Sequence, residues 1–181
     1  AMLYLINPLS AFFGGLSIFI YVLVYTPLKA YSSLAVFVGA IPGAIPFMLG
    51  WVAATNQFGI ESGALFALQF LWQFPHFWAI AWLVYNDYAK AGYYLLPTRK
   101  KDNLSAILAI LYTVWMIVVS VLPYFGLTGN LTLSLASTIL IVLIGLYRLW
   151  KAIAMYKGQT EKDAKKLMMA SIMYLTLVQV V

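Results

Sequence analysis

The sequence predicts an all-α fold, a polytopic bundle of about six transmembrane helices that forms a single domain over residues 1–181. Three observations lead to this prediction. Hydrophobic residues make up 64% of the chain and charged residues only 9%, a balance far from that of soluble proteins. Charge-free stretches approach the roughly 20 residues that a helix needs to cross the hydrocarbon core of a bilayer. These stretches are unbroken, without the alternation of apolar and polar residues that is typical of transmembrane barrels.

The candidate spans are the apolar stretches that approach this length. They cover residues 9–26, 34–53, 63–85, 104–125, 131–147 and 167–181. The last stretch is short for a membrane crossing. Residues 1–6 are also apolar and stop at Asn7-Pro8, a dipeptide typical of turns, as the end of an earlier span would. We therefore expect a chain that is truncated at both ends.

The distribution of charge predicts the orientation of the bundle. All eleven Lys and Arg residues follow the first, third or fifth stretch, and the opposite loops carry only Glu61. By the positive-inside rule, the basic side is cytoplasmic. We expect an integral membrane protein, and the membrane we expect is the bacterial inner (plasma) membrane. The net charge of +6 then reflects topology and contact with the lipid bilayer, and no nucleic-acid partner is expected.

Small residues and prolines recur in the second stretch. Gly39 and Gly43 are four residues apart, and Pro42 and Pro46 follow the same spacing. Small residues at this interval allow helices to approach closely, and prolines favour a bend. Helix packing alone is a sufficient interpretation of this pattern.

The third stretch carries polar residues, which are costly in hydrocarbon. On one continuous helix, Gln69, Gln73, His76 and Asp87 would fall within about 60° of one another, and His76 would lie about 16 Å from Asp87. Pro75 could interrupt this stripe. His76, the only histidine, is compatible with an interhelical hydrogen bond and equally with a role in ligand binding or proton handling.

Asp87 is a candidate metal ligand at the basic side. It would end the third span, where the helix dipole disfavours an anion, so a nearby cation would explain it. Lys29, Lys90 and Arg99 belong to loops on the same side, and one carboxylate with several basic residues suits a Mg²⁺-diphosphate group. The same basic residues would also serve as positive-inside anchors. The sequence has no Gly-rich phosphate loop, paired-histidine motif or serine triad.

Several motifs in register carry a resemblance. They are Tyr25-Thr-Pro-Leu-Lys29, Gly39-Ala-Ile-Pro-Gly-Ala-Ile-Pro46, Trp72-Gln-Phe-Pro-His-Phe-Trp-Ala-Ile-Ala-Trp82 and Asp87-Tyr-Ala-Lys-Ala-Gly92. Over about residues 7–150, the sequence resembles the protoheme IX farnesyltransferase (heme O synthase) family of intramembrane UbiA-type prenyltransferases. The run from Trp72 to Trp82 is particularly distinctive of this heme branch.

The resemblance implies a UbiA-like fold of nine spans, of which this chain supplies the last six. It implies a prenyltransferase of heme A biosynthesis, which transfers the farnesyl group of farnesyl diphosphate to a vinyl group of heme b with Mg²⁺ as cofactor. Heme A synthase or oxidase assembly factors are the partners it suggests. The family has two acidic motifs, and Asp87 matches the second. The first would precede residue 1, so the fragment alone is expected to be inactive.

The resemblance also suggests roles for individual residues. Asp87 would hold Mg²⁺, Lys29 would contact diphosphate, and Tyr25 would support the farnesyl cation or an oxygen. Two positions depart from the family pattern, since Ala30 replaces a usual basic residue and Phe47 a frequent proline. The expected substrate contacts are Lys90 and Arg99 for diphosphate, and His76, Gln73 and Gln69 for heme.

Two other functions remain open at this point. One keeps the prenyltransferase fold but uses an aromatic quinone precursor as acceptor, against which the run around His76 argues. The other is a non-catalytic transport or assembly subunit that uses the polar stripe as a pathway.

Overall fold

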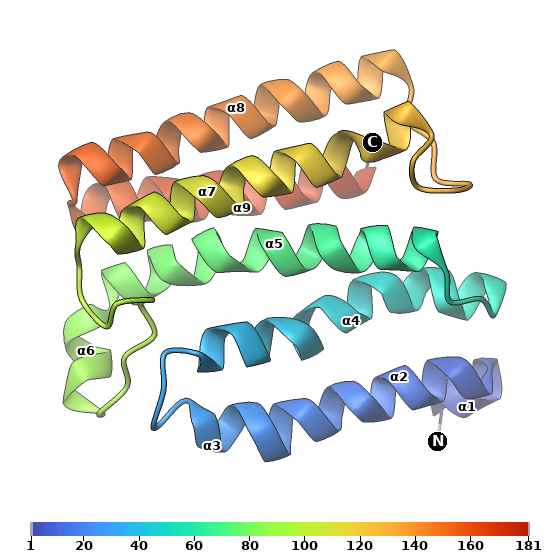
Figure 1. Cartoon of the computed structure of the whole chain (residues 1–181), viewed down its shortest axis with the longest axis horizontal. Helices are drawn as coiled ribbons and strands as arrows, with labels where there is room; N and C mark the ends of the chain where they lie inside the picture. The colour runs from blue at the N-terminus through green and yellow to red at the C-terminus, as the bar shows by residue number, and fades with distance from the viewer. Residues whose placement is uncertain (1, 181) are drawn as a thin grey trace.

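The computed structural model describes residues 2–180, and every regular element in this part of the chain is helical, which confirms the all-α prediction. The long helices run side by side as one bundle (Figure 1). In chain order, the elements are α1 (Met2–Ile6), α2 (Pro8–Phe19), η1 (Ile20–Tyr25), α3 (Thr26–Leu28), α4 (Ala35–Thr55), α5 (Ile60–Leu83), α6 (Tyr85–Lys90), α7 (Asn103–Val121), η2 (Leu122–Phe125), α8 (Leu135–Gly158) and α9 (Glu161–Val180).

Four stretches are long and apolar enough to cross a membrane, which fits an integral membrane protein. They are Pro8–Leu28, Ala35–Thr55, Asn103–Phe125 and Leu135–Gly158. The expected number of about six spans depends on including α5 and α9, which have 24 and 20 residues but carry more polar side chains. At about 1.5 Å per residue, both are long enough for a crossing. They lie alongside the other helices, and α5 packs against α4, α7 and α9.

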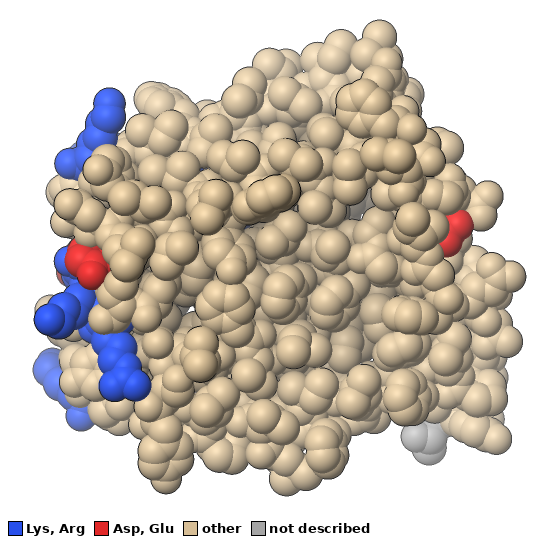
Figure 2. All heavy atoms as spheres, in the orientation of Figure 1, with Lys and Arg blue, Asp and Glu red and all other residues tan. Residues whose placement is uncertain are grey.

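The two ends of the bundle differ in charge. Lys and Arg side chains gather at one end in the space-filling view, and the opposite end shows a single acidic group (Figure 2). The basic end is where α6 lies, where α7 and α9 begin, and where α8 ends (Figure 1). The charge asymmetry expected from the sequence is therefore a property of the folded chain.

Helix boundaries correct the sequence prediction in the last third of the chain. The fifth span does not stop at Tyr147, because α8 continues to Gly158 and ends at Gln159, whose backbone is left-handed (φ 48°). Arg148 therefore lies within the helix, fully buried, and not in a loop. The last helix begins at Glu161, six residues earlier than expected, so it is not short for a span. Its predicted last residue, Val181, lies outside the described residues.

The helix that carries the polar stripe is also interrupted. α5 ends at Leu83, and α6 starts afresh after Val84, whose backbone is not helical (φ −102°, ψ 24°). Asp87 therefore lies in the first turn of the short α6 and not at the C-terminal end of the span. The dipole argument was wrong, because an anion is favoured in a first turn. The stripe does not continue from His76 to Asp87 on one helix.

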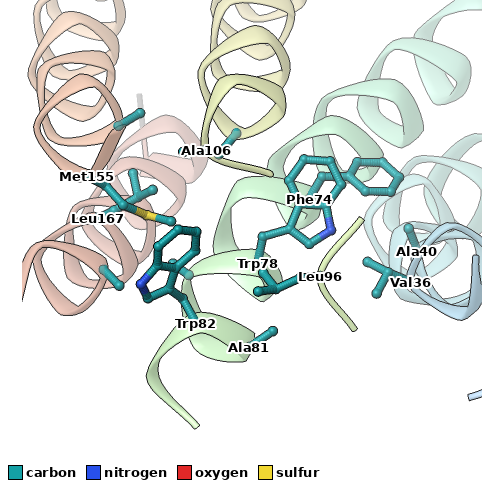
Figure 3. Packing of buried hydrophobic residues seen from close by; sticks show 14 residues of the cluster. Val36, Ala40, Phe74, Trp78, Ala81, Trp82, Leu96, Ala106, Met155 and Leu167 are labelled. Atoms are coloured by element: carbon teal, nitrogen blue, oxygen red, sulfur yellow. The ribbon is translucent and has the colours of Figure 1, made fainter. Parts of the chain in front are cut away.

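The core lies around α5. Phe74, Trp78 and Trp82 project from this helix and are almost completely buried, and Figure 3 shows them between residues of α4, α7, α8 and α9. The rings of Phe37 and Tyr112 each lie 4.6 Å from that of Phe74, centroid to centroid. Between helices in lipid, such close packing supplies the attraction that the hydrophobic effect supplies in water. This aromatic cluster fixes α4 and α7 on either side of α5.

The prolines of α4 are accommodated without ending the helix. Pro46 has no N–H, so the carbonyl of Pro42 loses its partner four residues on. The hydroxyl of Ser17 donates to that carbonyl oxygen at 3.1 Å, which satisfies it and ties α2 to α4. A side-chain donor from a neighbouring helix is the usual way in which a membrane bundle tolerates proline.

Candidate functional site

An apolar cavity of about 470 Å³ lies between α2 and η1 on one side and α4 and α5 on the other. We call it the apolar cavity. Its few polar groups come from Gln73, Ser17 and two tyrosines. The lining residues are Ser17, Ile18, Tyr21, Val22, Tyr25, Val36, Gly39, Pro42, Gly43, Gln73, Phe77 and Leu95.

Tyr25, which lines the cavity, is the last residue of the π-helical segment η1. The backbone N–H of Thr26 donates to the carbonyl oxygen of Tyr21, five residues back, and the Thr26 hydroxyl donates to the same oxygen at 2.8 Å. Such wider turns are rare and occur frequently at functional sites. The rings of Tyr21 and Tyr25 lie 5.2 Å apart. Gly39 makes room for the Tyr25 ring, since a Cβ at residue 39 would lie 2.7 Å from carbons of that ring.

Gln73 reaches the cavity wall from α5, on the side that faces α4. Its Nε2 donates to the carbonyl of Ala40 at 3.0 Å and to that of Gln69 at 3.2 Å. Its Oε1 rests against Gly43, where a Cβ would collide with it. Gly39 and Gly43 were predicted to allow close helix contact. In the structure, Tyr25 packs against Gly39 and Gln73 against Gly43, and both side chains line the cavity.

Two of the predicted basic residues meet in a pocket of about 130 Å³ at the basic end, which we call the basic pocket. It is lined by Lys29 and Arg99 together with the loops that carry them. Arg99 donates to the carbonyl of Tyr31 at 3.1 Å, and Lys29 Nζ lies 5.6 Å from the ring centroid of Tyr93. The remaining lining residues are Ala30, Tyr31, Ser32, Ser33, Gly92 and Tyr94.

The basic pocket adjoins the apolar cavity along the chain. Lys29 follows Tyr25 by one helical turn, and Leu95 of the cavity is the direct neighbour of Tyr94 of the pocket. A molecule with a charged head and a long apolar body could therefore place one part in each. The sequence placed Lys29, Arg99 and Tyr25 on the same side of the membrane, but it did not anticipate this division into two spaces.

Asp87 and Lys90 form an exposed ion pair on α6. Their charged atoms are 3.5 Å apart, and the side chains are 78% and 80% exposed. Neither residue lines the basic pocket. Among the described residues, no three potential metal ligands come together. Asp87 can still supply one carboxylate to a Mg²⁺ ion, because such ions usually take one or two carboxylates together with substrate phosphates.

His76 and Gln69 do not line the cavity with Gln73. His76 Nδ1 lies 2.6 Å from Ser171 Oγ on α9, and its ring stacks on Trp72 at 4.6 Å. The buried side-chain oxygen of Gln69 has no hydrogen-bond partner among the described residues. The predicted polar stripe thus divides between two neighbours of α5, with Gln73 towards α4 and His76 towards α9.

Sequence reasoning missed one buried charge, Arg148 on α8. Its guanidinium donates to the Trp72 carbonyl at 3.0 Å and to the Met116 sulfur. A signal for its burial exists in the sequence, because it continues the three- and four-residue spacing of the buried face of α8. That face comprises Ile141, Ile144, Gly145, Arg148, Ala152 and Met155.

These features define an integral membrane protein with an apolar, aromatic cavity between its helices and a basic pocket at the basic end. The chain belongs to the UbiA prenyltransferase family, whose sequence profile matches residues 1–178.

Curated relatives give a more particular comparison. The chain is 59% identical to the protoheme IX farnesyltransferase of Flavobacterium psychrophilum and 58% identical to that of Christiangramia forsetii, in both cases over 99% of this chain and 60% of the relative. It is 43% identical to the protoheme IX farnesyltransferase of Cytophaga hutchinsonii, over 91% of this chain and 57% of that protein. The chain thus spans about 60% of the length of these relatives. No solved structure gives a significant match.

Proposed function

We propose that the protein to which this chain belongs is a protoheme IX farnesyltransferase, which joins farnesyl diphosphate to a vinyl group of heme b and yields heme O and diphosphate. The observation that carries the proposal is the apolar cavity beside the basic pocket. This pairing suits an amphiphile with a long hydrocarbon chain and a diphosphate head. The names of the relatives supply the acceptor, heme b. Heme A synthase and oxidase assembly factors are the partners we propose for the product.

The basic residues would receive the leaving group. When the carbon–oxygen bond of the allylic diphosphate breaks, its electron pair stays with diphosphate, and the charged side chains of Lys29 and Arg99 would stabilise that anion. Lys90 would approach it from α6 once its contact with Asp87 is exchanged for a contact with phosphate. Ala30 also lines the basic pocket, where it leaves more space and less positive charge than a second basic residue would.

The cavity wall would protect the farnesyl cation. Tyr25 and Tyr21 line the cavity, and aromatic rings attract a cation through their electron density. The apolar lining would exclude water that would otherwise capture the cation before the heme vinyl group does. Of the three polar residues proposed to contact heme, Gln73 lines this cavity. We therefore assign it to the acceptor, with His76 and Gln69 supporting the helix that carries it.

Asp87 is the residue of this chain that would hold Mg²⁺. Bound Mg²⁺ would neutralise diphosphate charge and so assist its departure. The side chain of Asp87 is exposed and bonded only loosely to Lys90, at 3.5 Å, so it can turn to the metal at little cost. The basic end of the bundle would face the cytoplasm, in a bacterial inner membrane.

The test of the proposal is heme O formation by the full-length protein in membranes, with Asp87→Asn as the variant. We expect a loss of at least about 100-fold in turnover, because the amide is a poor ligand for Mg²⁺. The control is Glu161→Gln, since Glu161 is also an exposed carboxylate at the basic end and pairs with Lys101 at 3.1 Å. Near-normal turnover by Asp87→Asn would overturn the assignment of this residue.

The alternative acceptor is tested with the same preparation. Prenylation of a hydroxybenzoate in place of heme b would show a quinone-precursor prenyltransferase. Solute or ion flux in liposomes without any prenyl transfer would instead support the transport function. Neither alternative is favoured by a specific feature of the cavity.

A further inference from the structure

A groove of about 640 Å³ runs along the seam between α8 and α9 at the basic end of the bundle, separate from the cavity and pocket described above. We call it the lysine groove. Four lysines line the groove nearer the basic end, and Tyr147 and two methionines line it deeper in the bundle. Its residues are Tyr147, Lys151, Lys162, Lys165, Lys166, Met169, Ala170 and Met173.

The positive charge of the groove is only partly compensated. Within residues 2–180, the one ion pair made by these four lysines is that of Lys166 with Asp163, at 3.7 Å. Glu161 at the start of α9 forms an ion pair with Lys101, at 3.1 Å, and Lys101 does not line the groove. Lys151 lies over aromatic rings, 3.8 Å from the centroid of Trp150. A cluster of four lysines with one acidic partner attracts an anion.

The groove is layered along the membrane normal. On α9, Lys162 and Lys166 are one turn apart, and Met169 and Met173 continue the same face deeper into the bundle. Met173 lies about 10 Å further along the helix than Lys166 at 1.5 Å per residue. Met169 is 55% exposed and Met173 is 42% exposed. Positive charge at the interface with an apolar surface below it matches a lipid headgroup followed by its acyl chain. A free anion would contact only the lysines and not this apolar surface.

We propose that the lysine groove is a binding site for one acidic phospholipid, with the phosphate among Lys151, Lys162 and Lys165 and an acyl chain along Met169 and Met173. Positive-inside topology alone requires lysines on this side of the membrane but not their convergence on an apolar groove. Lys100 and Lys157 illustrate the difference, because both lie near the basic end without lining the groove. The proposal does not depend on the catalytic function.

The absence of cysteine from the 181 residues allows a local test in the reconstituted full-length protein, with any cysteine outside this segment replaced by serine. Met173→Cys carries a bimane fluorophore in the groove. Val114→Cys on α7 is the control position, since it is 40% exposed and about as far from the basic end as Met173 is. Quenching is compared between bilayers that contain brominated phosphatidylglycerol and bilayers that contain brominated phosphatidylcholine at the same mole fraction.

We expect the label at residue 173 to be quenched about fivefold more effectively by the acidic lipid, and the label at residue 114 to show no such preference. Lys162→Gln with Lys165→Gln should abolish the preference. Lys100→Gln with Lys157→Gln, which removes the same charge, should leave it intact. Lys162→Arg with Lys165→Arg should retain it, which controls for misfolding.

Three results would overturn the proposal. Equal lipid preference at both label positions, or equal loss in both glutamine double variants, would indicate only a general surface potential. An unchanged preference in Lys162→Gln with Lys165→Gln would exclude these lysines. Reversal of quenching by inorganic phosphate would indicate a site for free anions instead of a lipid.

Discussion

Arg148 donates a hydrogen bond from Nη2 to the carbonyl oxygen of Trp72, at 3.0 Å, across the interior of the bundle. The guanidinium is fully buried, and no carboxylate pairs with it among the described residues. Its other neighbours are the rings of Trp72 and Tyr174, 5.9 and 5.6 Å away, and the sulfur of Met116. A buried charge in a membrane protein is expensive, so it must be compensated by such dipoles and ring faces. Arg148 therefore links α8 to α5 beside the segment that carries His76.

The first prediction concerns this link. Arg148→Ala should lower the stability of the bundle by about 3 kcal/mol, because it leaves a cavity between α8 and α5 and removes the packing of the long side chain. Arg148→Met should cost much less, since it fills the space and removes a charge without a counter-ion. Thermal unfolding in detergent measures both. Equal destabilisation by Ala and Met would mean that the charge itself, and not the volume, holds the helices together.

The second prediction concerns the fit of Tyr25 against α4. Gly39→Ala should displace the Tyr25 ring, since the new Cβ would lie 2.7 Å from it, and should lower kcat/KM for heme O formation by about tenfold or more. Gly50→Ala is the control in the same helix, because a Cβ there meets no atom within 4 Å. It should leave activity unchanged and raise stability by up to about 1 kcal/mol. Full activity in Gly39→Ala would remove Tyr25 from the site.

The third prediction concerns the basic pocket. Lys29→Gln and Arg99→Gln should each raise KM for farnesyl diphosphate by about tenfold, because each removes a charge-assisted contact with the leaving group. Lys100→Gln removes the same charge beside the pocket without lining it, and KM should not change. Steady-state kinetics at fixed heme b give these values. A similar KM increase in all three variants would reduce the role of the pocket to general attraction of anions.

The sequence alone predicted the helical fold and the charged end, because both follow from the lengths of the apolar runs and the positions of the charged residues between them. Long apolar runs are typical of membrane helices, and the lysines lie where the loops between alternate runs place them. It also identified Tyr25, Lys29 and Arg99, which the fold places around the adjoining cavity and pocket. Their roles in the reaction remain predictions.

What the sequence could not supply depends on the neighbours of each helix. Gln73 and His76 are three residues apart and seemed to share a face, but α5 has helices on several sides, so one bonds to α4 and the other to α9. The helix breaks at Val84 without a proline or glycine that would have indicated the break in the sequence. As a result, Asp87 does not belong to the span. Arg148 looked like a loop anchor because a charge usually ends an apolar run.

The fourth prediction is a pH dependence at the opposite end of the bundle, outside the apolar stretch 63–85. Glu61 Oε1 accepts hydrogen bonds from the backbone N–H of Asn130 at 3.0 Å and from its side chain at 2.8 Å. The bond from the Asn130 backbone is the main reason why the pKa of the Glu61 carboxyl is lowered. Gly129 (φ 62°) allows this approach, since a Cβ there would collide with the carboxylate.

Because the pKa of Glu61 is lowered in the folded state, the ionised carboxylate stabilises the fold at any pH above its unfolded pKa of about 4.3. This stabilisation is lost as the pH falls through the folded pKa. Glu61→Gln keeps an acceptor without the charge, so it should unfold at a lower temperature than the wild type at neutral pH and at the same temperature once the wild type is protonated. Thermal unfolding between pH 7 and about pH 3 tests this. Asn130→Ala retains the backbone donor and should preserve most of the pH dependence. If the unfolding temperatures of wild type and Glu61→Gln changed in parallel with pH, this carboxylate would not hold the loop before α8 against α5.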